Sequence, residues 1–263
     1  MNIILSIFFF LIGTCLGSFA NVCIYRLPKG KSIAWPPSFC PKCHHRISWH
    51  DNIPLFSFFL LRGKCRSCQG RISPGYFIVE FLAGIITFFL FLRFNVSPEF
   101  FIYLIFILAL IIVSFIDIEN FLIPDCIVYS GIVLGLFLSF LYPELQSQTF
   151  SRLLALKASF MGTLLGGGSL FIIGLIGGII FKKEAMGGGD VKLLAMIGAF
   201  LGVKSVLLTI FFSSLAGSVI GLTLILLKVK KRSDYIPYGP YLALGAIISL
   251  FWKGYYFIGF LIN

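Results

Sequence analysis

The chain has 263 residues, of which 59% are hydrophobic and 12% are charged, and its formal net charge is +11. A soluble domain carries about 25% charged residues, so this composition excludes an ordinary soluble protein. The mean hydropathy of +1.01 points the same way. The excess of Lys and Arg is typical of an anionic partner or of a membrane topology, and its distribution along the chain decides between the two.

Eight apolar runs follow one another along the chain, and most of them approach the ~20 residues that cross a bilayer as a helix. In chain order they are 3–24, 76–92, 100–116, 125–142, 159–181, 191–203, 204–227 and 238–261. The run at 191–203 is the shortest of them. The sequence therefore predicts an all-α polytopic membrane protein with about eight transmembrane helices.

The first run predicts a retained helix rather than a cleaved signal peptide. Met1 and Asn2 supply no positive charge before it, and it exceeds the ~7–15 apolar residues of a signal peptide. Thr14 before Cys15 also fits a lipoprotein site poorly. We therefore expect residues 1–24 to form the first transmembrane helix.

Lys and Arg gather in the segments that eight spans would place on one side of the membrane. With the loop after the first span inside, sixteen of the 21 Lys and Arg residues fall on the inner side. Such a bias follows the positive-inside rule. It predicts an N-terminus outside and a cytoplasmic loop at 25–75. The charge then reflects the lipid bilayer as partner, and no nucleic acid is expected.

The loop at 25–75 contains two C-x2-C pairs separated by 21 residues. Four thiolates on two tight turns suit tetrahedral zinc, and the spacing is close to the ~15–20 residues of known zinc sites. Cytosolic thiols stay reduced, which disfavours disulfides. We expect a small zinc-binding insertion after the first helix, with a redox dithiol as the alternative. Its four ligands would be Cys40, Cys43, Cys65 and Cys68, and the neighbouring His44, His45 and His50 would lie at the surface.

Two segments place carboxylates beside apolar spans, where ionisable residues are costly and usually functional. Asp190 follows three glycines in GGGDVKLL, and FIDIENFLIPD borders the junction of the third and fourth spans. On the predicted topology both segments lie at the cytoplasmic membrane face. Carboxylates from different helices therefore have the same depth and are expected to meet.

Two carboxylates in one poorly solvated site divide their protonation, so that one is ionised and the other is protonated near neutrality. The ionised group can take a proton from water while the protonated group polarises a peptide carbonyl, which is aspartic-protease chemistry. Glycines beside Asp190 would let an extended substrate come close. The alternative is an aspartate that only caps the next helix, beside glycines that only pack helices. Spacing alone does not decide.

The same segments resemble the type IV prepilin leader peptidase family. GGGDVKLLAMIGAFLG is similar to its glycine-x-glycine-aspartate signature, and FIDIENFLIPD to its other catalytic segment. GSFANVCIYRLP, the tetracysteine block, DNIP, LRGKCRSC and ISPGYFIVE follow in the family's order. The resemblance runs from about residue 13 to past residue 202. Members with the tetracysteine block are typically bifunctional: they remove a short basic leader from prepilins and then methylate the new N-terminal amine with S-adenosylmethionine.

Carried over position by position, the resemblance implies a role for each matching residue. It assigns the catalytic pair to Asp117 and Asp190 and the signature glycines to Gly187 and Gly189. Glu119 and Asp125 would support the peptidase site. The implied organisation is a first helix at 1–24, a zinc-binding loop associated with methyl transfer at 25–75, and a peptidase bundle at 76–263.

For methyl transfer the resemblance implies S-adenosylmethionine as donor, with zinc holding the fold of the loop. No glycine-rich nucleotide fingerprint follows a strand, so the residues involved are candidates only. An N-terminal amine has a reference pKa of ~7.7–8.0 and is partly neutral, so the enzyme would mainly align it. The candidates are Glu80, Asn21, Arg26, Asp51 and Asn52. For Glu80 two interpretations stay open, a contact with the cofactor or a structural tie to Arg26 or Arg71.

The resemblance further implies a multi-pass protein of the bacterial cytoplasmic (inner) membrane, with both active sites facing the cytoplasm and with type IV pilin, secretion pseudopilin or competence pilin as substrate. A peptidase without methyltransferase activity is the main alternative. A proton-coupled transporter could use the same carboxylates as a relay, and a membrane scaffold could use the zinc loop to bind partners.

Overall fold

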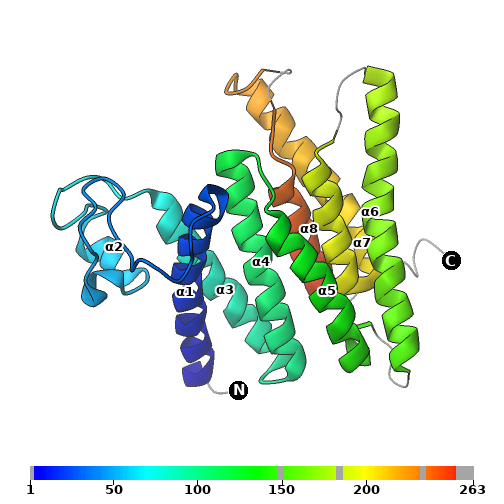
Figure 1. Ribbon diagram of the computed structural model, residues 1–263, viewed down its shortest axis with the longest axis horizontal. Coiled ribbons are helices and arrows are strands. Elements are labelled where there is room, and N and C mark those ends of the chain that lie inside the picture. Colours follow the sequence, from blue (N-terminus) through cyan, green and yellow to red (C-terminus); the bar gives the residue numbers. More distant parts are fainter. Residues whose placement is uncertain (1–2, 147–150, 182–185, 232–234, 253–263) are drawn as a thin grey trace. The chain divides into compact units, whose positions relative to one another are not determined.

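Figure 1 shows the computed structural model, which describes residues 3–146, 151–181, 186–231 and 235–252. Over these ranges the chain is helical apart from its loops and two isolated β-bridges. It divides into two compact units, Met1–Ile112 and Val113–Asn263. The end of the predicted 238–261 span lies outside the described residues, as do Lys182, Lys183, Arg232 and Lys253.

The first unit is built on two long antiparallel helices, α1 (Ile3–Arg26) and α3 (Pro74–Phe94). Phe9 near the start of α1 stacks on Phe91 near the end of α3, with 4.4 Å between ring centroids. At the other end of the pair, the Asn21 side chain donates a hydrogen bond to the Tyr76 carbonyl. Both ends of the segment that joins the helices therefore lie on the same side of the pair.

That joining segment, residues 27–73, is called the cysteine loop below. It contains two 3-10 turns and one short helix, which are η1 (Leu27–Lys29), η2 (Trp49–Asn52) and α2 (Phe56–Leu60). After α3, the helix α4 (Pro98–Asn120) begins in the first unit and ends in the second.

The second unit contains the end of α4, four further helices and one 3-10 turn. In chain order these are α5 (Asp125–Leu141), η3 (Pro143–Gln146), α6 (Arg152–Phe181), α7 (Gly188–Leu226) and α8 (Gly239–Phe251). Glycines bring α6 and α7 into backbone contact, because a Cβ on Gly162 would overlap the Gly198 carbonyl. Small residues commonly allow membrane helices to approach in this way. The close approach of α6 and α7 therefore depends on these two glycines.

The helix α7 folds back on itself at Gly202, which has φ 75° and ψ 179°. Gly187 at its start lies near the Tyr235 hydroxyl, and Gly221 near its end lies close to Ile236. In a straight helix the two glycines would be about 50 Å apart at 1.5 Å per residue, so contact with consecutive residues requires a reversal. The positive φ is one that glycine adopts without strain.

Polar side chains stabilise this reversal. The Gln146 amide donates hydrogen bonds to the carbonyls of Ala199 and Phe200, at 3.1 and 3.3 Å. The Ser159 hydroxyl donates to the Ala199 carbonyl at 2.6 Å. Carbonyls at a helix end have no partner within the helix, and side chains from other elements supply one here.

Five described helices are long and apolar enough to cross a membrane, and α5 and α8 are shorter apolar helices. The break at Gly202 agrees with the predicted boundary between the runs 191–203 and 204–227. The structure confirms an all-α, multi-pass membrane protein, and the number of eight spans stays a prediction.

Candidate functional site

The two predicted catalytic aspartates lie at helix ends in the second unit. Asp117 belongs to the last turn of α4 and Asp190 to the first turn of α7. Each residue is only 5% exposed. The two acids lie close enough for the Asp117 charge to act on the Asp190 carboxyl.

The two carboxyls differ in their hydrogen bonds. Asp117 Oδ2 accepts one from the backbone N–H of Gly239 at 2.9 Å. Asp190 Oδ1 is buried and has no hydrogen-bond partner among the described residues. A buried acid oxygen without a partner is costly, and it is available to a substrate or a catalytic water. The cap interpretation of Asp190 is not supported, because Gly187 is the N-cap and α7 has no side-chain cap bond there.

The glycines before Asp190 are not equivalent. A Cβ on Gly187 would lie 3.0 Å from Asp190 Oδ2, and one on Gly189 would lie 2.9 Å from Ile123 Cβ. A Cβ on Gly188 would meet nothing within 4 Å. The two positions of the glycine-x-glycine-aspartate signature therefore need the absence of a side chain, and the middle position does not.

Two residues near the aspartates were missed by the sequence analysis. A Cβ on Gly239 would lie 2.7 Å from Asp117 Oδ2, so this glycine permits the contact between α8 and the acid. The Tyr235 hydroxyl lies near Gly187, and its ring packs edge-on against Phe121. The segment YGPYLALG contains a Gly-Pro pair, a signal for a break before a helix, but it does not indicate a partner for Asp117.

The two predicted supporting acids lie outside the buried pair. Glu119 is exposed at the end of α4. Asp125 forms an ion pair with Lys192 at 2.8 Å, and its side chain is 59% exposed. This pair joins the N-terminal ends of α5 and α7, whereas among the described residues neither Glu119 nor Asp125 is bonded to Asp117 or Asp190.

The four cysteines of the cysteine loop form one cluster, with all sulfur atoms within 4.8 Å of one another. Cys40 Sγ and Cys68 Sγ are 3.9 Å apart. Tetrahedral zinc with Zn–S bonds of about 2.3 Å requires sulfurs about 3.8 Å apart. The donor set and its dimensions therefore fit a four-thiolate metal site.

The two C-x2-C pairs have the same backbone fold. Cys40 N–H donates to the His45 carbonyl and Cys65 N–H to the Gly70 carbonyl, both at 2.9 Å. His44 and Gln69, each directly after the second cysteine of its pair, have φ 56°. Two equivalent knuckles thus present their sulfurs to one point. His44, His45 and His50 are exposed, as predicted.

The thiols of the cluster influence one another in the absence of metal. Burial raises the pKa of the Cys40 thiol, but backbone hydrogen bonds from Cys43 and Lys42 outweigh it and lower that pKa to about 7. For Cys43 the His45 backbone hydrogen bond lowers the pKa, but burial and the neighbouring thiols raise it to about 11. Four thiolates this close repel one another, so a metal cation is the natural counter-charge.

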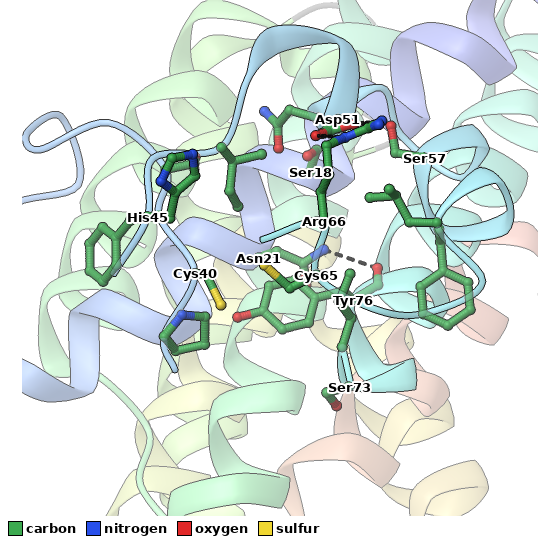
Figure 2. A pocket seen from close by; sticks show the side chains of 18 of the residues that line it. Ser18, Asn21, Cys40, His45, Asp51, Ser57, Cys65, Arg66, Ser73 and Tyr76 are labelled. Atoms are coloured by element: carbon green, nitrogen blue, oxygen red, sulfur yellow. Dashed lines mark hydrogen bonds and ion pairs between the residues drawn. The ribbon is translucent and has the colours of Figure 1, made fainter. Parts of the chain in front are cut away.

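A cavity of about 460 Å³ lies between the cysteine loop and the adjoining ends of α1 and α3 (Figure 2). It lies wholly within the first unit. All five candidate residues for methyl transfer line it, together with Cys40 and Cys65. The five are Asn21, Arg26, Asp51, Asn52 and Glu80.

Glu80 is tied to the loop through the backbone. Its Oε2 accepts a hydrogen bond from the Leu55 N–H at 2.8 Å, and the side chains of Ser18 and Asn21 also interact with its carboxyl. The alternative tie to Arg26 or Arg71 is wrong for the described structure, in which no ion pair joins them.

The Arg26 side chain is hydrogen-bonded to the backbone of the cysteine loop. Its guanidinium donates to the carbonyls of Ser32, Ile33, Pro36 and Pro37, and the residue is 4% exposed. A buried guanidinium has five donors to satisfy, and this bend of the cysteine loop supplies carbonyls for them. Arg26 therefore holds the loop against the end of α1.

Two parts of the chain match known protein families. The bacterial peptidase A24 N-terminal domain matches residues 11–94, and the type IV leader peptidase family matches residues 104–222. A prepilin leader peptidase/N-methyltransferase of Myxococcus xanthus is 36% identical over 84% of the chain and 63% of its own length. Enzymes with the same name from Stutzerimonas stutzeri and Pseudomonas aeruginosa are each 32% identical over 92% of the chain and 88% of their own lengths. No solved structure matches the chain significantly.

A buried pair of aspartates at adjoining helix ends, in a bundle of membrane-spanning helices, defines the class of membrane aspartic peptidases. A second site, the four-cysteine cluster beside a cavity, lies in the first unit. The chain belongs to the type IV leader peptidase family.

Proposed function

We propose that the chain removes the leader peptide of prepilins or prepilin-like proteins and then methylates the new N-terminal amine. The observation that carries the peptidase half is the buried pair of Asp117 and Asp190, one with an unpartnered oxygen. The observation that supports the methyltransferase half is the cavity lined by all five candidate residues. The names of the relatives agree with both halves.

For cleavage, one aspartate accepts the proton of an attacking water while the other, protonated, donates a hydrogen bond to the scissile carbonyl. The water adds to the carbonyl carbon, and the proton then passes to the leaving amine. The Gly239 N–H holds one oxygen of Asp117. The unpartnered oxygen of Asp190 is the group that a water would contact. Gly187, without a side chain, leaves space beside that carboxyl.

For methyl transfer, S-adenosylmethionine would supply an electrophilic methyl group carried on a sulfonium. The cavity volume lies in the range of about 300–1,000 Å³ that is usual for small-molecule sites. The acidic group of Glu80 suits the positive charge of such a donor, and Asn21 and Asn52 offer amide donors and acceptors. Glu80, held by the Leu55 N–H, would keep a fixed carboxyl at the α3 side of the cavity.

We propose zinc as the metal of the four-cysteine cluster, with a structural role. Four cysteines close a tetrahedral site and leave no position for a water. Cys40 and Cys65 line the cavity as well as the cluster. Metal binding would therefore order one wall of the proposed donor site and would contribute folding energy to the loop.

We infer a place in the bacterial cytoplasmic (inner) membrane, with both sites at its cytoplasmic face and the N-terminus outside. The bias of Lys and Arg toward one side supports this orientation. Within the second unit, Asp117, Asp190 and the start of α8 lie at one end, and Gln146 and Gly202 meet at another. This arrangement agrees with loops that alternate between the two sides of the membrane.

The experiment that tests the proposal combines the purified chain in detergent, an intact prepilin and S-adenosylmethionine. Mass spectrometry of the pilin N-terminus reports leader loss and the addition of one methyl group separately. We expect both changes with the chain and neither without it. Leader loss without methylation would leave the peptidase half and overturn the methyltransferase half. An intact prepilin would overturn the whole proposal.

A further inference from the structure

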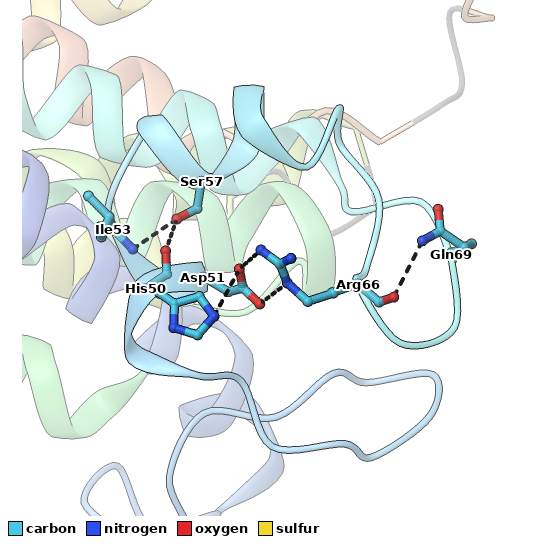
Figure 3. Close-up of polar contacts among 6 residues, drawn as sticks. All are labelled: His50, Asp51, Ile53, Ser57, Arg66 and Gln69. Atoms are coloured by element: carbon cyan, nitrogen blue, oxygen red, sulfur yellow. Dashed lines mark hydrogen bonds and ion pairs between the residues drawn. The ribbon is translucent and has the colours of Figure 1, made fainter.

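The short helix α2 has its polar side chain turned inward and three of its four apolar side chains turned outward. Ser57 is 7% exposed, and its hydroxyl donates to the His50 carbonyl and accepts from the Ile53 N–H (Figure 3). Phe56, Phe59 and Leu60 are 61%, 67% and 60% exposed. A helix that faces water has the opposite arrangement. These three residues are called the α2 outer face.

The α2 outer face continues onto the apolar surface of α3. The Phe59 ring packs edge-on against Phe77, with centroids 5.2 Å apart, and Phe77 stacks on Phe81 at 5.9 Å. Phe81 is 41% exposed. The helix α3 is long and apolar enough to cross a membrane, and only a third of its most apolar window is buried. One continuous aromatic surface therefore joins a membrane-spanning helix to the loop.

The helix α2 lies beside the first turns of α3, at the end where the cysteine loop joins that helix. Phe77 is in the first turn of α3, and Leu55, directly before α2, bonds to Glu80 about 9 Å from the start of that helix at 1.5 Å per residue. An interfacial helix buries its apolar face about 5–10 Å into the boundary between headgroups and acyl chains, which is a similar depth. Figure 1 shows α2 beside the pair of α1 and α3 rather than beyond its end.

The charges around α2 suit the same environment. Arg62 and Lys64 follow the helix directly, and Arg71 lies at the bridge to Lys64; all three are exposed. Apolar side chains flanked by Lys and Arg are the pattern of segments that lie in the interface of anionic membranes. Water would solvate the cations but not three exposed apolar side chains.

We propose that the α2 outer face inserts into the headgroup region of the bilayer, with anionic phospholipid as its partner. The insertion fixes the cysteine loop against the membrane surface instead of leaving it free in water. The cavity, one wall of which is attached to α2 through Ser57 and Phe58, then lies at the membrane surface.

The test uses the full chain with Trp35, Trp49 and Trp252 replaced by Phe, reconstituted in nanodiscs of phosphatidylethanolamine and phosphatidylglycerol. A single tryptophan is introduced as Phe59→Trp, or as Leu60→Trp in case the first variant does not fold. The reference is Phe89→Trp, because Phe89 lies within α3, five residues before its end, and is 52% exposed. Circular dichroism and gel filtration establish that each variant is folded.

Phospholipids brominated at shallow and deep acyl positions then quench the tryptophan emission by contact. We expect the folded α2 variant to be quenched at least half as strongly as Phe89→Trp. Quenching below half of the reference overturns the proposal. If a second copy of the chain covers this face instead, lipid quenching is weak and the emission changes with the number of chains per disc, which also overturns it.

Discussion

Arg66 connects the four-cysteine cluster to the wall of the loop cavity through Asp51. Arg66 lies between Cys65 and Cys68, and its Nε and Nη2 donate to the two carboxylate oxygens of Asp51 at 2.8 and 2.6 Å (Figure 3). The Asp51 side chain is 9% exposed and belongs to η2, which lines the cavity. One bidentate ion pair therefore ties the second knuckle to the Asp51 side of the cavity.

Replacing Arg66 with Gln is expected to lower methyl transfer about 10-fold, the usual effect of losing a residue that orients a metal or binding site. Leader removal should change less than twofold. The hydrogen bond from Arg66 lowers the pKa of Asp51, so Asp51 is ionised at neutral pH. In the Arg66→Gln variant Asp51 would stay ionised, because the ordinary pKa of Asp also lies below neutral pH, but it would lose its Arg partner. Separate rates of leader loss and methyl incorporation measure the two effects.

The exchange Asp51→Arg with Arg66→Asp provides the control, because it reverses the pair without removing it. We expect it to recover part of the methyl transfer lost in Asp51→Arg alone. An exchange variant no better than the single variant, with zinc content unchanged, would contradict the role of the pair. The stability of the pair depends on pH in a defined direction: its contribution is present above the ordinary pKa of Asp and is lost as pH falls through the lowered pKa of Asp51.

Replacing Cys40 and Cys43 with Ser is expected to release the metal, loosen the cysteine loop and abolish methyl transfer. Half of the ligands are lost, and a closed zinc site with two ligands does not persist. Leader removal should suffer less, because Asp117 and Asp190 lie in the second unit. Atomic absorption measures zinc, and limited proteolysis between residues 40 and 68 measures the loosening.

The matched control for the cysteine variants is Cys15→Ser, since Cys15 is an exposed cysteine of α1 outside the cluster. It should bind zinc and methylate as the parent does. Full methylation by a variant shown to contain no zinc would remove the proposed role of the cluster.

The helical fold and the cysteine cluster could be predicted because their signals are local. Apolar runs report membrane helices directly, and two C-x2-C turns bring four thiols together whatever the rest of the chain does. The boundary near residue 203 could also be predicted, because one apolar run ends there and the next begins. The left-handed conformation of Gly202 and its contact with Gln146 were not, because they depend on packing between distant segments.

The catalytic site was predictable only in part for the same reason. Asp117 and Asp190 stand out as carboxylates beside apolar spans, but the Gly239 N–H reaches Asp117 across 122 residues of chain. No periodicity or spacing reports such a contact. Arg26 is a further example. The sequence shows a charged residue beside a helix end, but the four carbonyls that accept from its guanidinium come together only once the loop has bent around it.

Asp117→Asn and Asp190→Asn are each expected to lower leader removal at least about 100-fold, the lower end of what general acid–base catalysis contributes. An amide of the same shape cannot take up the proton of water. Methylation of a pilin supplied without its leader should stay within about twofold, because the cavity belongs to the first unit. Gel-shift cleavage assays and radiolabelled methyl incorporation measure the two outcomes.

The controls for the aspartate variants are Glu119→Gln and Asp125→Asn, which remove exposed carboxylates near the same helix ends. Asp125→Asn breaks an exposed ion pair with Lys192, and such pairs contribute about 0.2–1 kcal/mol. Both controls should keep leader removal within about 10-fold of the parent. Loss as large as that of Asp117→Asn in either control would move that residue into the catalytic pair.

The glycines around the aspartates give the sharpest comparison, because three substitutions of the same size have different surroundings. Gly187→Ala places a methyl group 3.0 Å from Asp190 Oδ2, and Gly239→Ala places one 2.7 Å from Asp117 Oδ2. Gly188→Ala meets nothing within 4 Å. We expect the first two variants to lose leader removal at least about 10-fold, since a displaced carboxyl loses its alignment.

Gly188→Ala should retain at least half of the parent rate, and it should be at least as stable, because Gly188 is the first residue of α7 and a Cβ there meets nothing within 4 Å. Thermal unfolding in detergent and cleavage of an intact prepilin measure stability and rate on the same samples. If Gly188→Ala were as inactive as Gly187→Ala while remaining folded, the effect would come from backbone freedom rather than from space beside Asp190. If Gly239→Ala cleaved normally, the contact between α8 and Asp117 would have no part in the reaction.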